Sequence, residues 1–413
     1  MKVIIVGAGL GGLSASISIL LAGHEVLVLE SANEIKEVGA GIQILPNASR
    51  ILIEYGLRSQ LEEVATMPQK CFMNGWKGKK LAELNFHEQA KRMGSPFWDF
   101  HRADLQRIML ERAKELGAQI LVNCRVCSVN YNMDEMTVSA TTAGGDSYTG
   151  DLLVGADGIN SRLREILVGH ADPPTPTGDL AYRVLLDGAK LLEHPSLAEF
   201  IENPQVNYWL GPQCHCVNYV LKKGKFFNFV LLCPDDVPEG MSICEGKIDQ
   251  VKSVFAKWDP RVVDLLDLVE SSTIDKWKLC YREGINKWYH ESGMFCLLGD
   301  AVHATLPYLA SGAGMAIEDG AVLGTILERF SSKSDLRESM RQYQNKRKTR
   351  TEKIVARGNL QQTLYHLDDG PAQEERDFIL GLSDPPAGEA FVWRDKEMAP
   401  WLLGYNAFND AKI

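Results

Sequence analysis

Three glycines near the N-terminus have the spacing of a phosphate-binding turn. Gly7, Gly9 and Gly12 form the pattern G-x-G-x-x-G directly after the apolar, β-branched run at residues 3–6. Apolar residues then recur at helical spacing, and a second apolar run ends at Glu30. A strand, a glycine turn, a helix and a strand ending in an acid make up the βαβ unit that binds dinucleotides. In such a unit, Gly9 would let a pyrophosphate approach the backbone and the N-terminus of the helix.

The acid at the end of the second strand indicates which nucleotide fits. Glu30 can accept hydrogen bonds from a ribose diol and would repel a 2′-phosphate. This unit is therefore expected to bind the AMP half of FAD, or NAD, and not NADP. Leu10, at the start of the helix, is expected beside the nucleotide with the glycines. An ordinary glycine-rich turn is the alternative.

Two later strand ends carry Asp and Gly together. A buried-strand pattern at residues 151–154 runs into Asp157 and Gly158, and another at 294–298 ends at Gly299 and Asp300. Ligands of open α/β sheets bind beyond the carboxyl ends of the strands, so both turns are candidate cofactor sites. The next helix begins with a glycine-rich group that is also expected at the cofactor: Gly312, Ala313, Gly314 and Met315.

Two other positions suggest contact with a ligand. Gly39 and Gly41 flank a single residue in a loop, as expected where backbone lies close to a ligand, although a plain loop is the alternative. Arg102 lies at the start of an amphipathic helix, where the helix dipole disfavours a cation. A ligand role for Arg102 is expected, with a surface ion pair as the alternative.

Composition is that of an ordinary globular protein. The 413 residues are 45% hydrophobic and 24% charged, and the net charge of −10 argues against nucleic acid or an anionic membrane as partner. We see no signal peptide or membrane span, so a cytoplasmic location is expected. The nine scattered cysteines indicate reduced thiols. No metal site is expected from Cys124 and Cys127 or from 214–216, because both groups fall in strand-like runs.

Composition changes after Gly169, which suggests a division into parts. The fold class is α/β, with a Rossmann-type nucleotide-binding domain, an inserted, mostly antiparallel β-sheet substrate domain and C-terminal helices. The predicted bounds are 1–170 with 290–330 for the first domain, which would include a strand excursion at 66–100, then 171–289 and 331–413. The basic cluster at 346–348 is predicted to be a solvated helix face.

One hairpin of the predicted substrate domain carries residues suited to proton transfer. Residues 215–221 and 226–232 read as its two strands. The two-residue period places His215, Val217, Tyr219 and Leu221 on one face. A half-buried strand without a chemical role is the alternative.

The three turns, in this order, resemble the class A flavoprotein monooxygenases, the family of p-hydroxybenzoate hydroxylase, over nearly the whole chain. The stretch GDAVHATLPYLASGAGMAIEDGAVLG at 299–324 is most similar to the salicylate hydroxylase branch, as are GAGIQILPNA and WLLGYNA elsewhere. The resemblance implies a glutathione-reductase-like fold, bound FAD, and NADH or NADPH as a transient co-substrate. The lack of a second G-x-G-x-x-G in the sequence agrees with this family.

The resemblance also implies roles at the cofactor. Glu30 would bind the adenosine ribose, and Arg102 would contact FAD near the pyrophosphate. Asp157 would serve FAD and the pyridine nucleotide, while Asp300 would bind the ribityl chain. The N–H groups of residues 312–315 would face the N1–C2=O edge of the flavin, where the reduced ring carries negative charge.

The implied reaction is hydroxylation of a phenolic or aromatic acid by O₂ and NAD(P)H through a C4a-hydroperoxyflavin. Pro307 would line the space for oxygen. His215 and Tyr219 resemble a pair that contacts the phenol, and a histidine that titrates near neutral pH can accept the phenolic proton. Arg183 would hold a carboxylate or enolate oxygen, and a structural ion pair is its alternative. Tyr308 is a further candidate, since some relatives carry His or Gln there.

Several alternatives stay open. The hydroxylation could be decarboxylative, as in salicylate hydroxylase. Hydroxylation, dearomatisation or epoxidation of a larger secondary metabolite is a second possibility. A flavin oxidase or dehydrogenase is a different class of enzyme, and a non-catalytic nucleotide-binding protein is a third class. Small aromatic substrate, O₂ and NAD(P)H are the expected partners of a monomer or homodimer.

Overall fold

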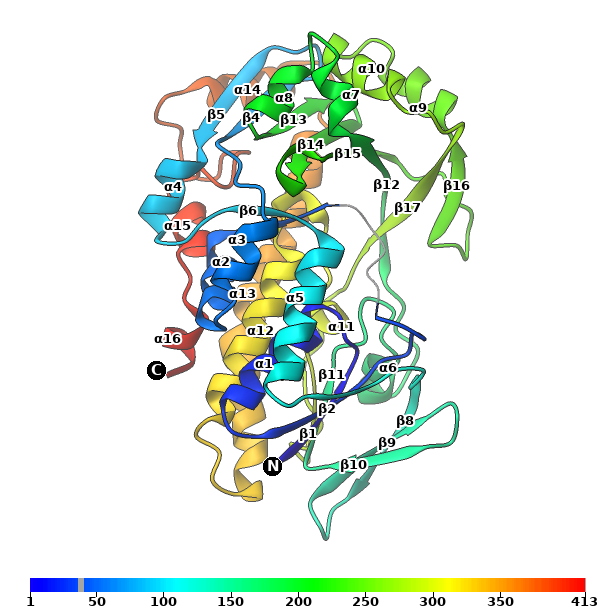
Figure 1. Ribbon diagram of the computed structural model, residues 1–413, viewed down its shortest axis with the longest axis vertical. Helices are drawn as coiled ribbons and strands as arrows, with labels where there is room; N and C mark the ends of the chain where they lie inside the picture. Colours follow the sequence, from blue (N-terminus) through cyan, green and yellow to red (C-terminus); the bar gives the residue numbers. More distant parts are fainter. Residues whose placement is uncertain (36–40, 413) are drawn as a thin grey trace.

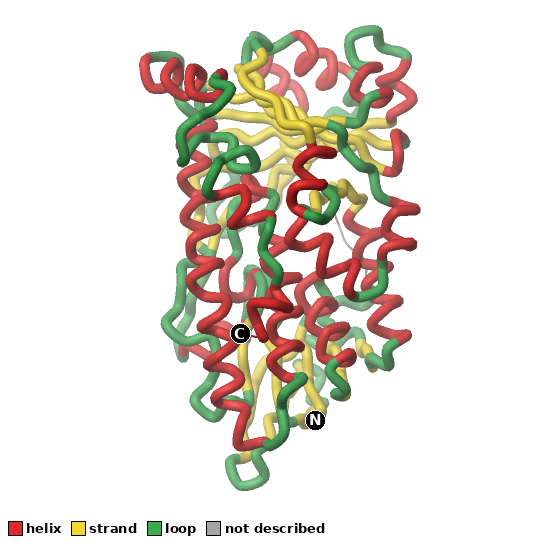
Figure 2. The backbone as a smooth tube through the Cα atoms, turned by 90° about the vertical axis from the view of Figure 1, so that its left-hand side faces the viewer, coloured by secondary structure: helices red, strands yellow, loops and turns green. Residues whose placement is uncertain are grey.

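The computed structural model describes residues 1–35 and 41–412. Strands gather toward the two ends of an elongated molecule, and long helices run between them (Figure 1; Figure 2). Within the described residues, no helix is both long enough and apolar enough to cross a membrane.

A five-stranded parallel sheet at one end contains the N-terminal βαβ unit. Its order is β18-β11-β1-β2-β7. The strands are β1 (Lys2–Val6), β2 (Glu25–Leu29), β7 (Gln119–Leu121), β11 (Leu152–Gly155) and β18 (Phe295–Leu297). Since β1, β11 and β18 are parallel neighbours, their carboxyl ends meet at one edge. The three turns that the sequence places far apart therefore lie next to one another.

Helices cover this sheet and connect it to the other end of the molecule. They are α1 (Leu10–Leu21), α2 (Pro46–Glu54), α5 (Arg102–Glu115), α12 (Gly312–Leu327), α13 (Leu336–Tyr365) and α16 (Ala407–Lys412). Helix α1 packs on α12, and α12 also contacts α2, α13 and α16. Gly320 and Gly324 permit this close packing, because a Cβ on either would lie within 2.5 Å of α1.

The described residues also form two small sheets. The first is antiparallel, with β8 (Val126–Asn132), β9 (Thr137–Thr142) and β10 (Ser147–Gly150). The second pairs β3 (Gly41–Ile44) with β6 (Trp98–His101).

An eight-stranded sheet forms the other end, in the order β16-β17-β12-β15-β14-β13-β4-β5. Its strands are β4 (Lys70–Gly75), β5 (Lys80–Asn85), β12 (Thr175–Asp187), β13 (Gln205–Gly211), β14 (Cys214–Leu221), β15 (Phe226–Pro234), β16 (Ile243–Lys247) and β17 (Thr273–Tyr281). The predicted hairpin is confirmed as β14 and β15. The strand pair expected within 66–100 is β4 and β5, which join this sheet because β4 pairs with β13 in parallel. The division into domains stays a prediction.

Shorter elements complete the chain. The helices are α3 (Arg58–Val64), α4 (Phe86–Met93), α6 (Arg162–Val168), α7 (Gly188–Leu192), α8 (Ala198–Glu202), α9 (Ile248–Phe255), α10 (Pro260–Asp267), α11 (Asp300–His303), α14 (Pro371–Gly381) and α15 (Met398–Leu403). The 3₁₀ turns are η1 (Lys222–Gly224), η2 (Pro307–Leu309) and η3 (Lys333–Asp335). Phe391, Trp393 and Leu402 pack with the eight-stranded sheet in one hydrophobic core. This part of the C-terminal region therefore belongs to that end of the molecule, whereas α16 packs on α12.

The prediction of a solvated face at residues 346–348 is wrong for Arg347. This side chain is fully buried, and its guanidinium donates to Asp319 Oδ1 at 2.7 Å and to Glu318 Oε2 at 2.6 Å. Arg350 donates to both carboxylate oxygens of Glu318, at 2.9 and 2.8 Å. Two acids on α12 make the burial of two arginines on α13 possible, because buried charges need partners.

Candidate active site

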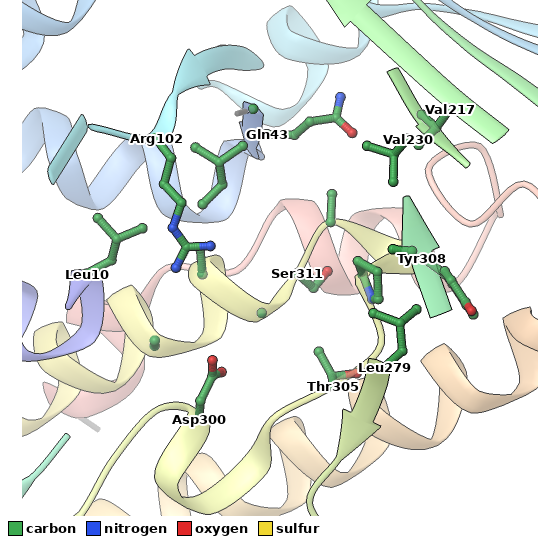
Figure 3. Close-up of a pocket in the computed structure, with 18 of the residues that line it drawn as sticks. Leu10, Gln43, Arg102, Val217, Val230, Leu279, Asp300, Thr305, Tyr308 and Ser311 are labelled. Carbon is green, nitrogen blue, oxygen red and sulfur yellow. The ribbon is translucent and has the colours of Figure 1, made fainter. Parts of the chain in front are cut away.

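A cavity of about 410 Å³ lies between the parallel sheet and the eight-stranded sheet (Figure 3). Most residues singled out in the sequence line it: Gly9, Leu10, Gly41, Arg102, Gly158, Arg183, His215, Tyr219, Asp300, Pro307, Tyr308, Gly312 and Ala313. Others do not line it: Gly7, Gly12, Glu30, Asp157, Gly314 and Met315. The structure therefore brings the nucleotide-binding turns and the His215 strand to one space.

The glycine turn after β1 has the geometry of a phosphate site. Gly7 has φ +107°, and a Cβ there would lie 2.3 Å from the carbonyl oxygen of Ala156. A Cβ on Gly12 would lie 2.0 Å from the carbonyl oxygen of Gly7, so glycine at both positions closes the turn onto α1. At Gly9, by contrast, a Cβ would meet no atom of the described residues within 4 Å. The open side of Gly9 faces the cavity and suits the close approach of a pyrophosphate.

Glu30 fixes the same turn from the end of β2. Its Oε2 accepts a hydrogen bond from the backbone N–H of Ala8, and its Oε1 accepts one from that of Ala32, both at 2.8 Å. A carboxylate oxygen can accept a second hydrogen bond, so this arrangement is compatible with binding a ribose hydroxyl.

The aspartates of the other two turns differ in their surroundings. Asp157 accepts hydrogen bonds from the Ser161 hydroxyl at 2.5 Å and from the Leu163 N–H at 3.0 Å. Burial raises the pKa of Asp157. Its carboxylate therefore stabilises its own turn, and Gly158 is the residue that lines the cavity. Asp300, at the start of α11, is exposed at the cavity wall (Figure 3).

Helix α12 points its N-terminus at the cavity. Gly312 and Ala313 line the space. Gly314 and Met315 pack behind them, and Met315 is 1% exposed. The first N–H groups of a helix lack partners within it and favour negative charge nearby. With the open turn at Gly9, this gives the cavity two regions suited to the phosphates and to the electron-rich ring of FAD, so the residues present fit this cofactor.

Tyr219, on β14, lies against Gly41 at the start of β3. A Cβ on Gly41 would lie 2.6 Å from the Tyr219 ring, so glycine there lets the two segments touch. The N–H of Gly41 also donates to Asn228 Oδ1 at 3.2 Å. Gly39, the other glycine of that predicted loop, lies outside the described residues.

His215 and Tyr219 lie on the same face of β14, as predicted, and both line the cavity. His215 is 1% exposed, and burial together with the nearby His366 holds the pKa of its imidazole well below its usual value. The expected titration of His215 near neutral pH is therefore wrong, because this imidazole is neutral there. Burial also raises the pKa of Tyr219.

The other two polar candidates already contact protein groups. The guanidinium of Arg183 stacks 5.0 Å from the ring centre of Trp277. The Tyr308 hydroxyl donates to Asp179 Oδ2 at 2.5 Å and points away from the centre of the cavity (Figure 3). Burial raises the pKa of Tyr308, so it stays a phenol. The roles assigned to the site residues stay predictions.

Several residues of the site were missed in the sequence. Gln43 and Asn228 are among them, and both line the cavity. Asn228 could have been found, because it alternates with the lining residues Val230 and Leu232 along β15. Gln43 donates to Asp99 Oδ1 at 3.1 Å, a contact with a distant strand that no local pattern reveals.

The fold and the cavity define an α/β dinucleotide-binding enzyme in which a second sheet closes the cavity beyond the nucleotide turns. Residues 1–358 match the family described as FAD binding domain. FAD-dependent monooxygenase OpS4 of Beauveria bassiana (strain ARSEF 2860) is 39% identical over 98% of this chain and 95% of the relative. 3-Hydroxybenzoate 6-hydroxylase of Polaromonas naphthalenivorans (strain CJ2) is 32% identical over 99% and 97% of the two chains.

Solved structures agree with this assignment. HpxO of Klebsiella pneumoniae, complexed with FAD and uric acid, matches with a TM-score of 0.79 and 25% identity over 92% of both chains. A salicylate hydroxylase substrate complex matches in fold with a TM-score of 0.82 and 22% identity, over 100% of this chain and 97% of that one. The chain belongs to the FAD binding domain family and is an FAD-dependent monooxygenase. The predicted fold class, cofactor and enzyme class are confirmed, and these relatives give the oxidase alternative no support.

Proposed function

We propose that this monooxygenase hydroxylates a phenolic or aromatic acid, with NADH or NADPH as the source of hydride. The supporting observation is the meeting of the nucleotide turns with the His215 and Tyr219 face in one cavity. Two relatives of similar length, 3-hydroxybenzoate 6-hydroxylase and 3-amino-4-hydroxybenzoate 2-monooxygenase PtmB3 of Streptomyces platensis, carry names that specify such acids.

The chain's own residues would bind and orient the ring. Bound FAD supplies the redox chemistry and the activation of oxygen. Val217, Val230 and Leu279 provide apolar contacts for an aromatic ring and exclude water. Neutral His215 can accept a hydrogen bond or a proton from the substrate hydroxyl, which would make the ring a stronger nucleophile. Arg183 is the cation of the cavity wall best placed for a substrate carboxylate.

A substrate screen tests this function. The purified flavoprotein is mixed with NADH or NADPH and with each of a panel of hydroxybenzoates, aminohydroxybenzoates and larger phenols. Substrate-stimulated oxidation of the nicotinamide, with a product heavier by one oxygen, supports the proposal. Loss of CO₂ from the same product identifies decarboxylative hydroxylation. Absence of stimulation by every phenol on the panel would contradict the proposed substrate class.

Two variants test the substrate face. His215→Ala and Tyr219→Phe are expected to reduce product formation while FAD stays bound, because neither residue belongs to the nucleotide turns. Tyr182→Phe is the matched control, since Tyr182 lies in the core on the opposite side of the sheet. If both variants turn over like the parent enzyme, the assignment of this face is wrong. A cytoplasmic location and a monomer or homodimer stay predictions.

A further inference from the structure

Behind His215, the cavity wall contains a chain of polar groups from distant parts of the sequence. Nδ1 of His215 lies 2.6 Å from Nε2 of His366, the residue that follows α13. Nδ1 of His366 lies 3.4 Å from Oδ2 of Asp179 in β12. The Tyr308 hydroxyl donates to the same oxygen at 2.5 Å. These groups form a path from the cavity to a buried carboxylate.

We propose that His366 and Asp179 are positioning residues of a proton relay, which moves the substrate's hydroxyl proton through His215 to the Asp179 carboxylate. The proposal rests on the proposed function, because it concerns the proton of a phenolic substrate. It adds His366 and Asp179 to His215 as residues that control the ionisation of that substrate.

The two new members are held in place by the backbone. The N–H of His366 donates to Gln362 O at 3.1 Å, and its carbonyl oxygen accepts from the N–H of Gln213 at 3.0 Å. The N–H of Asp179 donates to the Thr177 hydroxyl at 3.2 Å. Because both residues are fixed on ordered elements, the path exists before substrate arrives.

Burial determines which member can hold a proton. Side-chain exposure is 10% for His366 and 7% for Asp179. Burial lowers the pKa of His366 to about 4, and burial with the neighbouring His366 keeps the pKa of His215 well below its usual value. Burial raises the pKa of Asp179, although the hydrogen bond from Tyr308 opposes this rise. The imidazoles can therefore pass a proton but not keep it, whereas the carboxylate is made a better acceptor.

Other ionisable groups face the path without carrying the proton. The Tyr365 ring lies 5.2 Å from that of His215, and burial raises the pKa of Tyr365. A hydrogen bond with Cys214 and burial raise the pKa of the Cys233 thiol, and the charge of Asp179 adds to this rise, so the thiol stays neutral. The charge of Asp235 raises the pKa of Asp179, and Lys278 lies 3.3 Å from Asp235 and offsets part of that charge.

The transfer balances without any further reactant. At rest, each imidazole carries its proton on Nδ1, so that His215 donates to His366 and His366 faces Asp179. The substrate O–H gives its proton to Nε2 of His215, the Nδ1 proton of His215 moves to His366, and the Nδ1 proton of His366 moves to Asp179. The products are a phenolate, two neutral imidazoles and a protonated Asp179, with the total charge unchanged. The proton returns by the same path when the hydroxylated product is protonated.

Nuclear magnetic resonance of the holoenzyme with ¹⁵N-labelled histidine tests the resting state without substrate. At pH 7, both His215 and His366 should be neutral and protonated on Nδ1. Asp179→Leu should shift His366 toward the Nε2 form, whereas Asp235→Asn, the matched loss of a nearby carboxylate, should not. A charged imidazole, or an Nε2-protonated His366 in the parent, would overturn the relay even if the substrate screen succeeds.

The proton transfer to Asp179 is tested by the kinetics of the Asp179→Asn variant with a phenol from the screen. The amide has nearly the same size and shape as the carboxylate beside His366 but cannot take its proton, so product formation at pH 7 should fall by about tenfold or more. The rate of FAD reduction by the nicotinamide and the KM for the phenol should each change by less than about twofold. The defect should shrink as pH rises, since the ionised fraction of a free phenol grows about tenfold per pH unit below its pKa. A loss equal at all pH values, or no loss, would contradict the relay.

Discussion

Replacing Arg347 by Met should destabilise the enzyme strongly, because it leaves buried acids without a partner. Arg347 is fully buried and donates to Asp319 at 2.7 Å and to Glu318 at 2.6 Å. Methionine fills part of the same space but supplies no charge. Removing one partner of a buried ion pair costs about 3–5 kcal/mol, and most of this cost is the uncompensated charge that remains.

The lower end of that range applies here. Glu318 keeps two hydrogen bonds from Arg350, and Asp319 keeps contacts with His303 at 2.6 Å and with the Gly299 N–H at 2.8 Å. We therefore expect the free energy of unfolding to fall by about 3 kcal/mol. Both acids lie on α12, whose N-terminus lines the cavity, so the variant should also retain less FAD.

Urea titration monitored by tryptophan fluorescence measures this loss, and flavin absorbance after dialysis measures retention of FAD. Lys348→Met is the control, because Lys348 belongs to the same basic cluster but is only half-buried and bonds to the Asn286 carbonyl oxygen and to Glu352, not to the buried acids. Its free energy of unfolding should stay within about 0.5 kcal/mol of the parent. A change below about 1 kcal/mol for Arg347→Met would refute the claim that this ion-pair cluster needs Arg347.

The same cluster predicts a dependence on pH. Arg350 and Arg347 lower the pKa of Glu318, and His303 and Arg347 lower that of Asp319, against the opposing effect of burial. Because the folded pKa lies below the unfolded value of about 4, the stabilisation is present above that value and is lost as the pH falls through the folded pKa. Urea midpoints between pH 3 and pH 7 should therefore converge for the parent and for Arg347→Met in acid, and midpoints that stay equally separated would contradict this origin.

Three further substitutions give distinct outcomes. Gly41→Ala places a Cβ 2.6 Å from the Tyr219 ring. The free energy of unfolding, measured by urea titration, should fall by about 1–3 kcal/mol, and turnover should be slower. An unchanged urea midpoint would mean that Tyr219 can move aside. Burial raises the pKa of Asp99 to about 8, above its unfolded value of about 4. The contribution of Asp99 to the free energy of unfolding is therefore fully present below about pH 4 and is lost as the pH rises to about 8. Asp99→Asn should flatten this part of the plot of unfolding free energy against pH, and an unaltered plot would contradict the shift. Glu30→Ala removes the acceptor for the Ala8 N–H in the nucleotide turn and for the Ala32 N–H after β2. It should weaken FAD retention, measured by flavin absorbance after dialysis; full retention would show that the turn does not need Glu30.

Local patterns in the sequence predict the parts of the fold that local physics determines. The βαβ unit after Gly7 and the β14–β15 hairpin follow from glycine spacing, turn residues and period-two alternation. The same alternation places His215 and Tyr219 on the face that lines the cavity. The order of β1, β11 and β18 as parallel neighbours, which the tertiary structure supplies, brings the three turns together.

Contacts between distant elements could not be predicted in this way. His366 lies 151 residues from His215, and their contact depends on where a 30-residue helix ends. Arg347 looks like a surface residue beside Lys346 and Lys348, because the acids that bury it lie on another helix. The parallel pairing of β4 with β13 is likewise set by the tertiary arrangement and not by either strand. Asn228 is the exception among the missed residues, because the alternation along β15 could have revealed it.

The length of helix α13 sets the position of His366 relative to the ion pairs that hold this helix to α12. Its 30 residues span about 45 Å, with Arg347 and Arg350 locked to α12 near the middle and His366 directly after the last turn. An insertion of one residue between these points would advance His366 by about 1.5 Å and rotate it by about 100° around the helix axis. The tolerance of this segment to changes in length should therefore be far smaller than that of the loops, and grafting another C-terminal region onto the enzyme must preserve this register.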